Sequence, residues 1–251
     1  MMSAGAMGEL SEFHDISSEF TRFMMSYKFG IDEMMTKVNV LKDEFIYLHN
    51  YSPIEHVTSR LKSPESILKK ARRLDCPLVV DDIRANIWDI AGIRITCSFI
   101  SDTYKISDML TRQQDVNVIQ FKDYIEHPKS NGYRSLHLIV EVPVFMSDRV
   151  APVYVEVQIR TIAMDFWASL EHKIYYKYDK EVPAYLLDEL GDAATAANQL
   201  DTKMERLHDE IAKLNDLDDR EKTSVQLSDL LALPLPDGLL KSLVRRSRGD
   251  R

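Results

Sequence analysis

The stretch "PVYVEVQIR" (residues 152–160) alternates between apolar and polar side chains. Strict alternation with a period of two is the pattern of a β-strand that has one buried face. The apolar set is Val153, Val155, Val157 and Ile159, and the polar set is Tyr154, Glu156, Gln158 and Arg160. For this strand taken alone, a polar face that simply meets solvent is an adequate explanation. The stretch therefore predicts a β-strand with one buried face, and it does not indicate whether the polar face has a function.

Three stretches that precede it are also rich in β-branched residues and predict further strands. They are "AGIRITCSF" from residue 91, "DVNVIQFK" from residue 115 and "SLHLIVEV" from residue 135. Helical spacing of apolar residues predicts two helices within 11–49, broken near Gly30, and further helices over about 101–113 and from residue 161. Residues 184–214 predict a long amphipathic helix. Such a helix often packs against a partner subunit, although packing against its own domain is equally allowed.

Composition limits the class of protein. With 45% apolar and 29% charged residues among 251, the chain has the composition of an ordinary globular protein. No run approaches the ~20 apolar residues that cross a bilayer, and the N-terminus lacks the basic and apolar regions of a secretion signal. We therefore expect no membrane association and a cytoplasmic location. Cys76 and Cys97 are expected as reduced thiols, with Cys97 in the core.

The charge distribution is uneven. A net charge of −8 argues against general nucleic-acid binding, so we expect no DNA partner, and RNA binding is not supported by charge. One segment nevertheless carries six cations and a single acid, Glu65; the cations are Arg60, Lys62, Lys69, Lys70, Arg72 and Arg73. Such a cluster on an acidic protein suggests a small polyanion as ligand. A solvated helix face is the other explanation.

The same segment contains a clear helix start at "SPES" (residues 63–66). Ser63 can cap the helix, and Pro64 suits the first helical position. On a helix that runs to about Leu74, the residues Ser66, Lys70 and Arg73 recur at the spacing of one face. The sequence therefore predicts a cationic stripe beside an apolar one.

Two carboxylates complete a set of residues with a defined chemistry. Glu156 lies on the polar face, which Arg94, His137 and Gln158 could share, and Asp89 immediately precedes the strand from residue 91. Oxygen ligands for Mg²⁺ and a cationic rim for phosphates are what metal-assisted phosphoryl transfer requires. The chain has no G-x-x-x-x-G-K-[ST] loop, so it is not a P-loop enzyme.

The stretch "NGYRSLH" (residues 131–137) fits a nucleotide. Asn131 and Gly132 predict a sharp turn, and the ring of Tyr133 offers a stacking surface worth about 1–3 kcal/mol to a base. A nearby lysine and His137 can meet phosphate. Taken singly, Tyr133 as an ordinary turn aromatic and His137 as a satisfied strand residue are the simpler explanations.

Several motifs together resemble one family. The strings "VTSRLKSPES", "DIAGIR", "NGYRSLH", "VEVQIRT" and "FWASLEHK" are similar, in order and spacing, to those of the small alarmone synthetases of the RelA/SpoT type, close to the RelQ and RelP groups. The resemblance covers roughly residues 15–215. It implies an α+β fold related to nucleotidyltransferases, in which a mixed sheet is flanked by helices. It also implies transfer of the β,γ-pyrophosphate of ATP to the ribose 3'-hydroxyl of GDP or GTP, with GMP as a further acceptor to test, giving (p)ppGpp and AMP.

The resemblance also assigns roles to residues. Asp89 and Glu156 would hold Mg²⁺, and Glu156 would help to activate the 3'-hydroxyl. The ATP site would contain Arg60 and Arg94 on the adenine and, on the phosphates, Lys62, Ser66, Lys70 and Arg73. The acceptor site would contain Tyr133 as the guanine platform, with Lys129, Asn131, His137 and Gln158 nearby.

The residue patterns and the resemblance together predict a domain organisation. Residues 1–14 are expected to be flexible, 15–182 to form the synthetase domain, 183–215 to form a helix for oligomerisation, most simply into a tetramer, and 216–251 to form a mobile basic tail. The pairs His14-Asp15 and His208-Asp209 do not supply the ligands of the family's hydrolase domain, so synthesis without hydrolysis is expected.

One departure and two rival functions stay open. Where RelQ-like members read F-V-T-G-R, this chain has His56 and Ser59 at the Phe and Gly positions, which puts activation by pppGpp in doubt. A regulator that binds nucleotide or RNA without turnover is one rival. An enzyme with another acceptor, such as an adenosine nucleotide or a tRNA end, is the second.

Overall fold

The computed structural model describes residues 4–49, 51–177 and 183–221. The chain divides into two compact units, residues 1–205 and 206–251. The first unit contains all the strands and every residue predicted for the site. The predicted basic tail lies outside the described residues from position 222 onward.

A five-stranded mixed sheet forms the centre of the first unit, in the order β1-β2-β5-β4-β3. The strands are β1 (Ile54–Leu61), β2 (Ala91–Cys97), β3 (Asn117–Asp123), β4 (Leu136–Phe145) and β5 (Val150–Thr161). Only the pairing of β2 with β5 is parallel among these neighbours. Strand β5, which contains residues 152–160, is therefore central. Its apolar face is buried as predicted, and Val155 and Ile159 are fully inaccessible to solvent.

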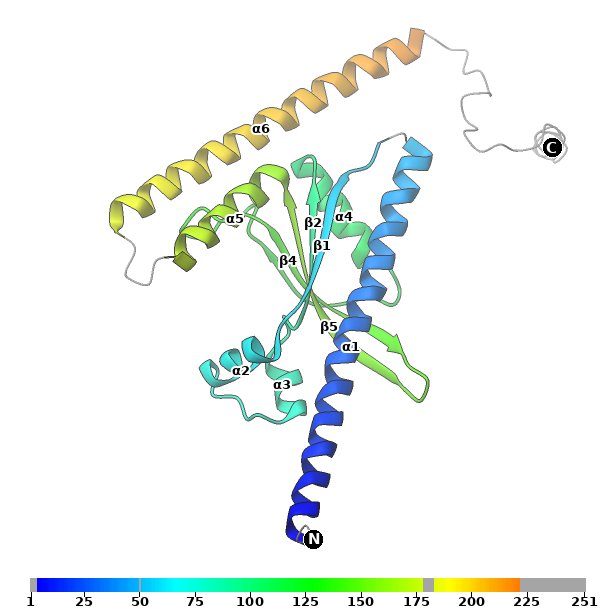
Figure 1. The fold of residues 1–251 in the computed structure, drawn as a ribbon. Coiled ribbons are helices and arrows are strands. Elements are labelled where there is room, and N and C mark those ends of the chain that lie inside the picture. Colours follow the sequence, from blue (N-terminus) through cyan, green and yellow to red (C-terminus); the bar gives the residue numbers. More distant parts are fainter. Residues whose placement is uncertain (1–3, 50, 178–182, 222–251) are drawn as a thin grey trace, which may run out of the picture. The chain divides into compact units, whose positions relative to one another are not determined.

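Helix α1 (Ala4–His49) covers the apolar face, and Figure 1 shows it running along the sheet, where it contacts β1, β2, β4 and β5. The predicted break near Gly30 was wrong. A Cβ at Gly30 would lie 2.7 Å from Cγ1 of Val153. The glycine therefore serves the close approach of a continuous helix to the sheet, rather than a turn. The expected flexibility of residues 1–14 stays a prediction, although the helix begins at Ala4.

The remaining helices are α2 (Pro64–Arg73), α3 (Val80–Asn86), α4 (Ile100–Thr111), α5 (Ile162–Lys177) and α6 (Ala184–Glu221). Helix α2 begins as predicted, since the Ser63 hydroxyl accepts a hydrogen bond from the Ser66 amide at 3.3 Å. Sequence analysis missed α3 and β1. Strand β1 is an edge strand in which Ile54 is buried but most side chains are exposed, so it has no apolar alternation to detect.

The first half of α6 packs against its own domain, which was one of the two predicted alternatives. Thr161 at the end of β5 donates a hydrogen bond of 2.6 Å to Asp201, and the indole nitrogen of Trp167 donates one of 3.0 Å to the carbonyl of Leu190. Glu205 accepts a hydrogen bond of 2.7 Å from the amide of Ile100 at the start of α4. A role of α6 in oligomers stays a prediction.

Both cysteines are free, as expected, and both are buried, and Cys97 lies in the core as predicted. Burial raises the pKa of the Cys97 thiol well above its usual range. Within the described residues, no helix is long and apolar enough to span a bilayer.

Candidate functional site

The register of the strands places five of the predicted residues in two adjacent rows across the polar face. Arg60 on β1 pairs with Gly92 on β2, which pairs with Glu156 on β5. In the next row Arg94 pairs with Gln158, which pairs with His137 on β4. Paired residues lie on the same face of a sheet. The polar face is therefore a site of opposed charges and not simply a solvated surface.

Asp89 joins the cationic helix to this face. Its two carboxylate oxygens accept hydrogen bonds of 2.6 Å from Lys62 and 2.7 Å from Lys70. Burial raises the pKa of Asp89, but the two ammonium groups outweigh burial and hold the pKa below its usual range. The carboxyl group is thus ionised at neutral pH and already lies next to cations that a phosphate could take over.

Glu156 has a cationic neighbour, Arg60, from the edge strand β1 and a histidine neighbour, His137, from the adjacent strand β4. Its Oε2 atom lies 3.7 Å from Nη2 of Arg60, and its Oε1 atom lies 3.9 Å from Nδ1 of His137. A cleft of about 190 Å³ opens beside it, lined by Arg60, Arg94 and Gln158 among others. A reacting group in this cleft would therefore meet a carboxylate and two guanidinium groups.

Tyr133 is held at its hydroxyl by two neighbours. Arg160 donates a hydrogen bond of 2.6 Å to the hydroxyl, and Nε2 of His137 lies 2.6 Å from it. The guanidinium of Arg160 lies over the ring at 5.1 Å and the ammonium of Lys129 lies over it at 4.8 Å. The ring thus has a fixed orientation, and of the two cations over it only Lys129 is exposed.

His137 is neutral at physiological pH. Burial is the largest cause, followed by the positive charges of Arg160, Lys129 and Lys122, and together they lower its pKa to about 3. A neutral imidazole offers hydrogen bonding rather than charge. Phosphate binding through a cationic His137 is therefore not favoured in this state.

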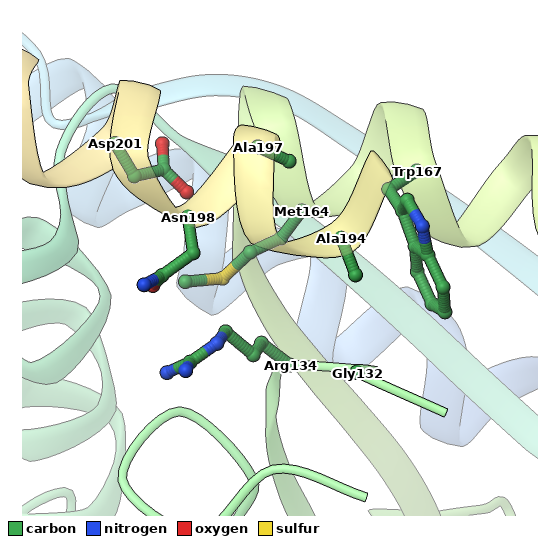
Figure 2. A pocket seen from close by; sticks show the side chains of 8 residues that line it. All are labelled: Gly132, Arg134, Met164, Trp167, Ala194, Ala197, Asn198 and Asp201. Atoms are coloured by element: carbon green, nitrogen blue, oxygen red, sulfur yellow. The ribbon is translucent and has the colours of Figure 1, made fainter. Parts of the chain in front are cut away.

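The turn before Tyr133 forms as predicted, with Gly132 at a positive φ of 85°. Asn131 accepts a hydrogen bond of 3.2 Å from the amide of Tyr133 and donates one of 3.2 Å to Glu171 on α5. Figure 2 shows Gly132 below the α6 residue Ala194, beside Trp167. A Cβ at Gly132 would lie only 2.5 Å from Cβ of Ala194. Helix α6 therefore packs directly on the turn that carries Tyr133.

Two predicted residues are placed less tightly. Ser66 is exposed and accepts a hydrogen bond of 2.9 Å from Ser63, and Arg73 is exposed in the last turn of α2. Both share with Lys70 the stripe that the spacing predicted. Their closeness to a ligand stays a prediction.

The comparisons with known proteins agree with this geometry. The family described as "Region found in RelA / SpoT proteins" matches residues 59–181. GTP pyrophosphokinase YwaC of Bacillus subtilis (strain 168) is 48% identical over 195 residues, which are 78% of this chain and 93% of the relative. The chain belongs to the small alarmone synthetases of the RelA/SpoT type.

Two further relatives of this small alarmone synthetase support the same assignment. GTP pyrophosphokinase YjbM of the same organism is 38% identical over 204 residues, or 81% of this chain and 95% of the relative. The crystal structure of small alarmone synthetase 1 from Bacillus subtilis bound to its product pppGpp has a TM-score of 0.71 and 39% identity, covering 77% of this chain and 98% of that chain. The region matched by the family, 59–181, contains every predicted site residue of this small alarmone synthetase.

The donor set of the small alarmone synthetase fits Mg²⁺ in part. Among the described side chains there is no group of three or more His, Cys, Asp or Glu that could hold a metal by itself. Asp89 and Glu156 offer carboxylate oxygens, and Mg²⁺ commonly binds through one or two carboxylates plus substrate phosphates. The residues present therefore fit a metal that binds together with a nucleotide.

Sequence reasoning missed two residues of this site, Arg160 and Asp165. Arg160 is almost fully buried, and it donates hydrogen bonds to Tyr133 and Gln158. Asp165, in the first turn of α5, lies within 3.2 Å of a guanidinium nitrogen of Arg160. For Arg160 one signal was available, namely its place on the polar face of a strand whose neighbouring residues Glu156 and Gln158 had been assigned to the site. Asp165 left no signal, because its partners depend on how α5 docks.

Proposed function

We propose that this chain transfers the β,γ-pyrophosphate of ATP to the ribose 3'-hydroxyl of GDP or GTP, through the residues of the polar face. The chain is a GTP pyrophosphokinase, an alarmone synthetase that makes (p)ppGpp and AMP. The observation that supports the residue assignment is that each proposed carboxylate has cationic partners, namely Lys62 and Lys70 for Asp89 and Arg60 for Glu156. Arg60, Glu156 and Lys70 come from β1, β5 and α2, which Figure 1 labels, whereas Lys62 and Asp89 lie in the connections next to β1 and β2.

ATP is proposed to bind along β1, α2 and β2. Arg60 and Arg94 line the cleft beside Glu156, where a planar guanidinium can stack on a base. Lys62 and Lys70 can exchange the Asp89 carboxylate for phosphate oxygens, and Ser66 and Arg73 extend the same helical stripe. This arrangement would align the triphosphate with the carboxylates.

The acceptor is proposed to bind at the turn from Lys129 to Tyr133. Guanine would stack on the side of the Tyr133 ring where Lys129 lies, because Lys129 is exposed and free to move aside. Asn131 and Gln158 offer amide groups, and neutral His137 steadies the Tyr133 hydroxyl. The acceptor ribose would then face Glu156.

The reaction follows from this placement. The 3'-oxygen attacks the β-phosphorus, its proton passes to the carboxylate of Glu156, and the bond from the β-phosphorus to the α,β-bridging oxygen breaks to release AMP. Bound Mg²⁺, held by Asp89 and Glu156, would neutralise charge on the phosphates. The arginines and lysines position both nucleotides, and positioning with electrostatic stabilisation supplies most of the rate in phosphoryl transfer.

The test is a separation of products by anion exchange after incubation with ATP, Mg²⁺ and GDP, GTP or GMP. We expect AMP and a guanosine with a 3'-pyrophosphate, and the loss of both in Glu156→Gln by about three orders of magnitude or more. Glu156→Gln should still bind both nucleotides in calorimetry. Near-normal turnover in this variant would remove Glu156 from the mechanism, whereas binding without turnover in the wild type would favour the regulator that sequence analysis left open.

Oligomerisation and location are also part of the proposal. Helices α5 and α6 line an apolar groove of about 770 Å³, and Phe166 and Leu200 are more than half exposed there. This exposed apolar groove supports a homo-oligomer, which we expect to be a tetramer. The test is to compare the molar mass of Phe166→Asp with that of the wild type by light scattering. A cytoplasmic location is proposed because the substrates ATP, GDP and GTP are held there.

A further inference from the structure

One carboxylate oxygen joins the two proposed nucleotide sites. Oδ1 of Asp165 lies 3.1 Å from Nη1 of Arg94 and 3.2 Å from Nη1 of Arg160. Arg94 comes from β2, Arg160 from β5 and Asp165 from the first turn of α5. The same oxygen thus serves an arginine of the ATP cleft and an arginine that holds the acceptor platform.

The link continues from Arg160 to the acceptor site. The other terminal nitrogen of Arg160, Nη2, donates hydrogen bonds to the Tyr133 hydroxyl, at 2.6 Å, and to the side-chain oxygen of Gln158. The forked guanidinium therefore uses one arm for Asp165 and the other for two acceptor-site residues. A lysine has a single nitrogen, so it could not place one donor nitrogen at Asp165 and a second at Tyr133 and Gln158.

The two arginines differ in their freedom to move. The side chain of Arg94 is 39% exposed, that of Asp165 is 28% exposed and that of Arg160 is only 5% exposed. Arg94 can therefore leave the shared oxygen for a ligand in the cleft, while Arg160 must stay. If Arg94 leaves, Arg160 keeps Asp165 as its partner and loses the repulsion of the neighbouring Arg94 guanidinium, so we expect its contacts with Tyr133 and Gln158 to become firmer.

We propose that Asp165 is a positioning residue that couples occupancy of the ATP site to the affinity of the acceptor site. The inference rests on the proposed function, in which Arg94 contacts the ATP base and Tyr133 carries the guanine. ATP would pull Arg94 from Asp165 and so prepare Tyr133 for the acceptor. Because coupling between two binding sites is reciprocal, bound acceptor would strengthen ATP binding by the same factor.

A purely structural role of Asp165 makes a different prediction. An acidic residue in the first turn of a helix is stabilising by itself, so Asp165→Asn could lower thermal stability without any effect on coupling. The decisive measurement is therefore a ratio of two affinities and not the activity alone.

The experiment measures GDP binding by calorimetry, with Mg²⁺, in the absence and presence of saturating α,β-methylene-ATP, whose bond at the reacting position cannot be cleaved. In the wild type we expect GDP to bind at least about fivefold tighter when the analogue is present. In Asp165→Asn the ratio of the two dissociation constants should fall at least about threefold, and the KM for GDP measured with saturating ATP should rise more than kcat falls. Asp108→Asn is the matched control, because it neutralises an exposed carboxylate on α4 that lies 3.3 Å from Arg112, and it should leave the ratio unchanged.

The outcomes separate the two proposals. The first case is a wild type that binds both ligands. The coupling role is then wrong if the ratio of the two GDP dissociation constants is 1 in the wild type, or if it is the same in Asp165→Asn. The proposed function stands in either event. If the wild type binds neither ligand, both fail. If Asp165→Asn does not fold, the same ratio is measured in Arg160→Lys, which keeps the positive charge but loses the two-armed guanidinium. A wild-type ratio in Arg160→Lys would overturn the inference.

Discussion

Gly132→Ala tests whether α6 sets the position of the turn that carries Tyr133. Two costs add in this variant. An L-residue at a φ of 85° is strained by about 1–2 kcal/mol. The added methyl would lie 2.5 Å from Cβ of Ala194, and neither atom can rotate away, so overpacking adds about 1–3 kcal/mol. We expect the free energy of unfolding to fall by about 2–5 kcal/mol in total.

A double-mutant cycle separates the two costs. Ala194→Gly removes the atom that the new methyl meets, and by itself costs about 1 kcal/mol because it places a glycine inside a helix. In the Ala194→Gly background, Gly132→Ala should cost only the strain of about 1–2 kcal/mol. The interaction energy of the cycle is then about 1–3 kcal/mol.

The assay is urea unfolding followed by tryptophan fluorescence, since Trp167 belongs to the same packed cluster. Gly191→Ala on the same helix is the control, because a Cβ there has open space around it; it should be neutral or stabilising by up to about 1 kcal/mol. The KM for GDP should rise in Gly132→Ala and recover in the double variant. An interaction energy of zero would refute direct packing of α6 on the turn.

Three further predictions follow from the same structure. Gly30→Ala should lower stability by about 1–3 kcal/mol despite the better helix former, because its Cβ would lie 2.7 Å from Val153; a Val153→Ala background should relieve this, and an equal loss in both backgrounds would contradict the close approach. The folded-state pKa of His137, about 3, lies below the ordinary 6.5, so the unfolded state binds the proton first and stability falls as pH drops below about 6.5. Between pH 7 and pH 5 the wild type should lose about 2 kcal/mol more than His137→Gln does, as measured by urea unfolding at both pH values; equal losses would argue against a neutral, buried His137. Finally, incubation of ppGpp with the protein and Mg²⁺ or Mn²⁺ should release no pyrophosphate, and release would show a hydrolase activity.

The local parts of the fold could be predicted from the sequence. The alternation of residues 152–160 gave the central strand and its buried face, and Ser63 with Pro64 gave the start of α2. Each of these signals is contained within a few residues, because side-chain direction in strands and capping at helix ends are set by the neighbouring backbone. The family motifs are also short stretches of neighbouring residues, and they predicted which residues belong to the candidate site.

The parts that were missed depend on distant packing. Strand β1 exposes most of its side chains, so only its pairing with β2 defines it. Gly30 looked like a helix break because a glycine signals flexibility in sequence, whereas the nearness of Val153 is its actual reason. Neither partner can be read from the residues next to it.

The sequence by itself therefore determined which residue types are present for the chemistry, namely the carboxylates Asp89 and Glu156 and the aromatic Tyr133 within recognisable motifs. The tertiary structure alone decided how they are connected. The register of β2 with β5 sets Arg94 beside Gln158, and the docking of α5 brings Asp165 to both Arg94 and Arg160. The physical reason is that charges act over a few ångströms of space, and only the folded chain brings residues far apart in sequence within that distance.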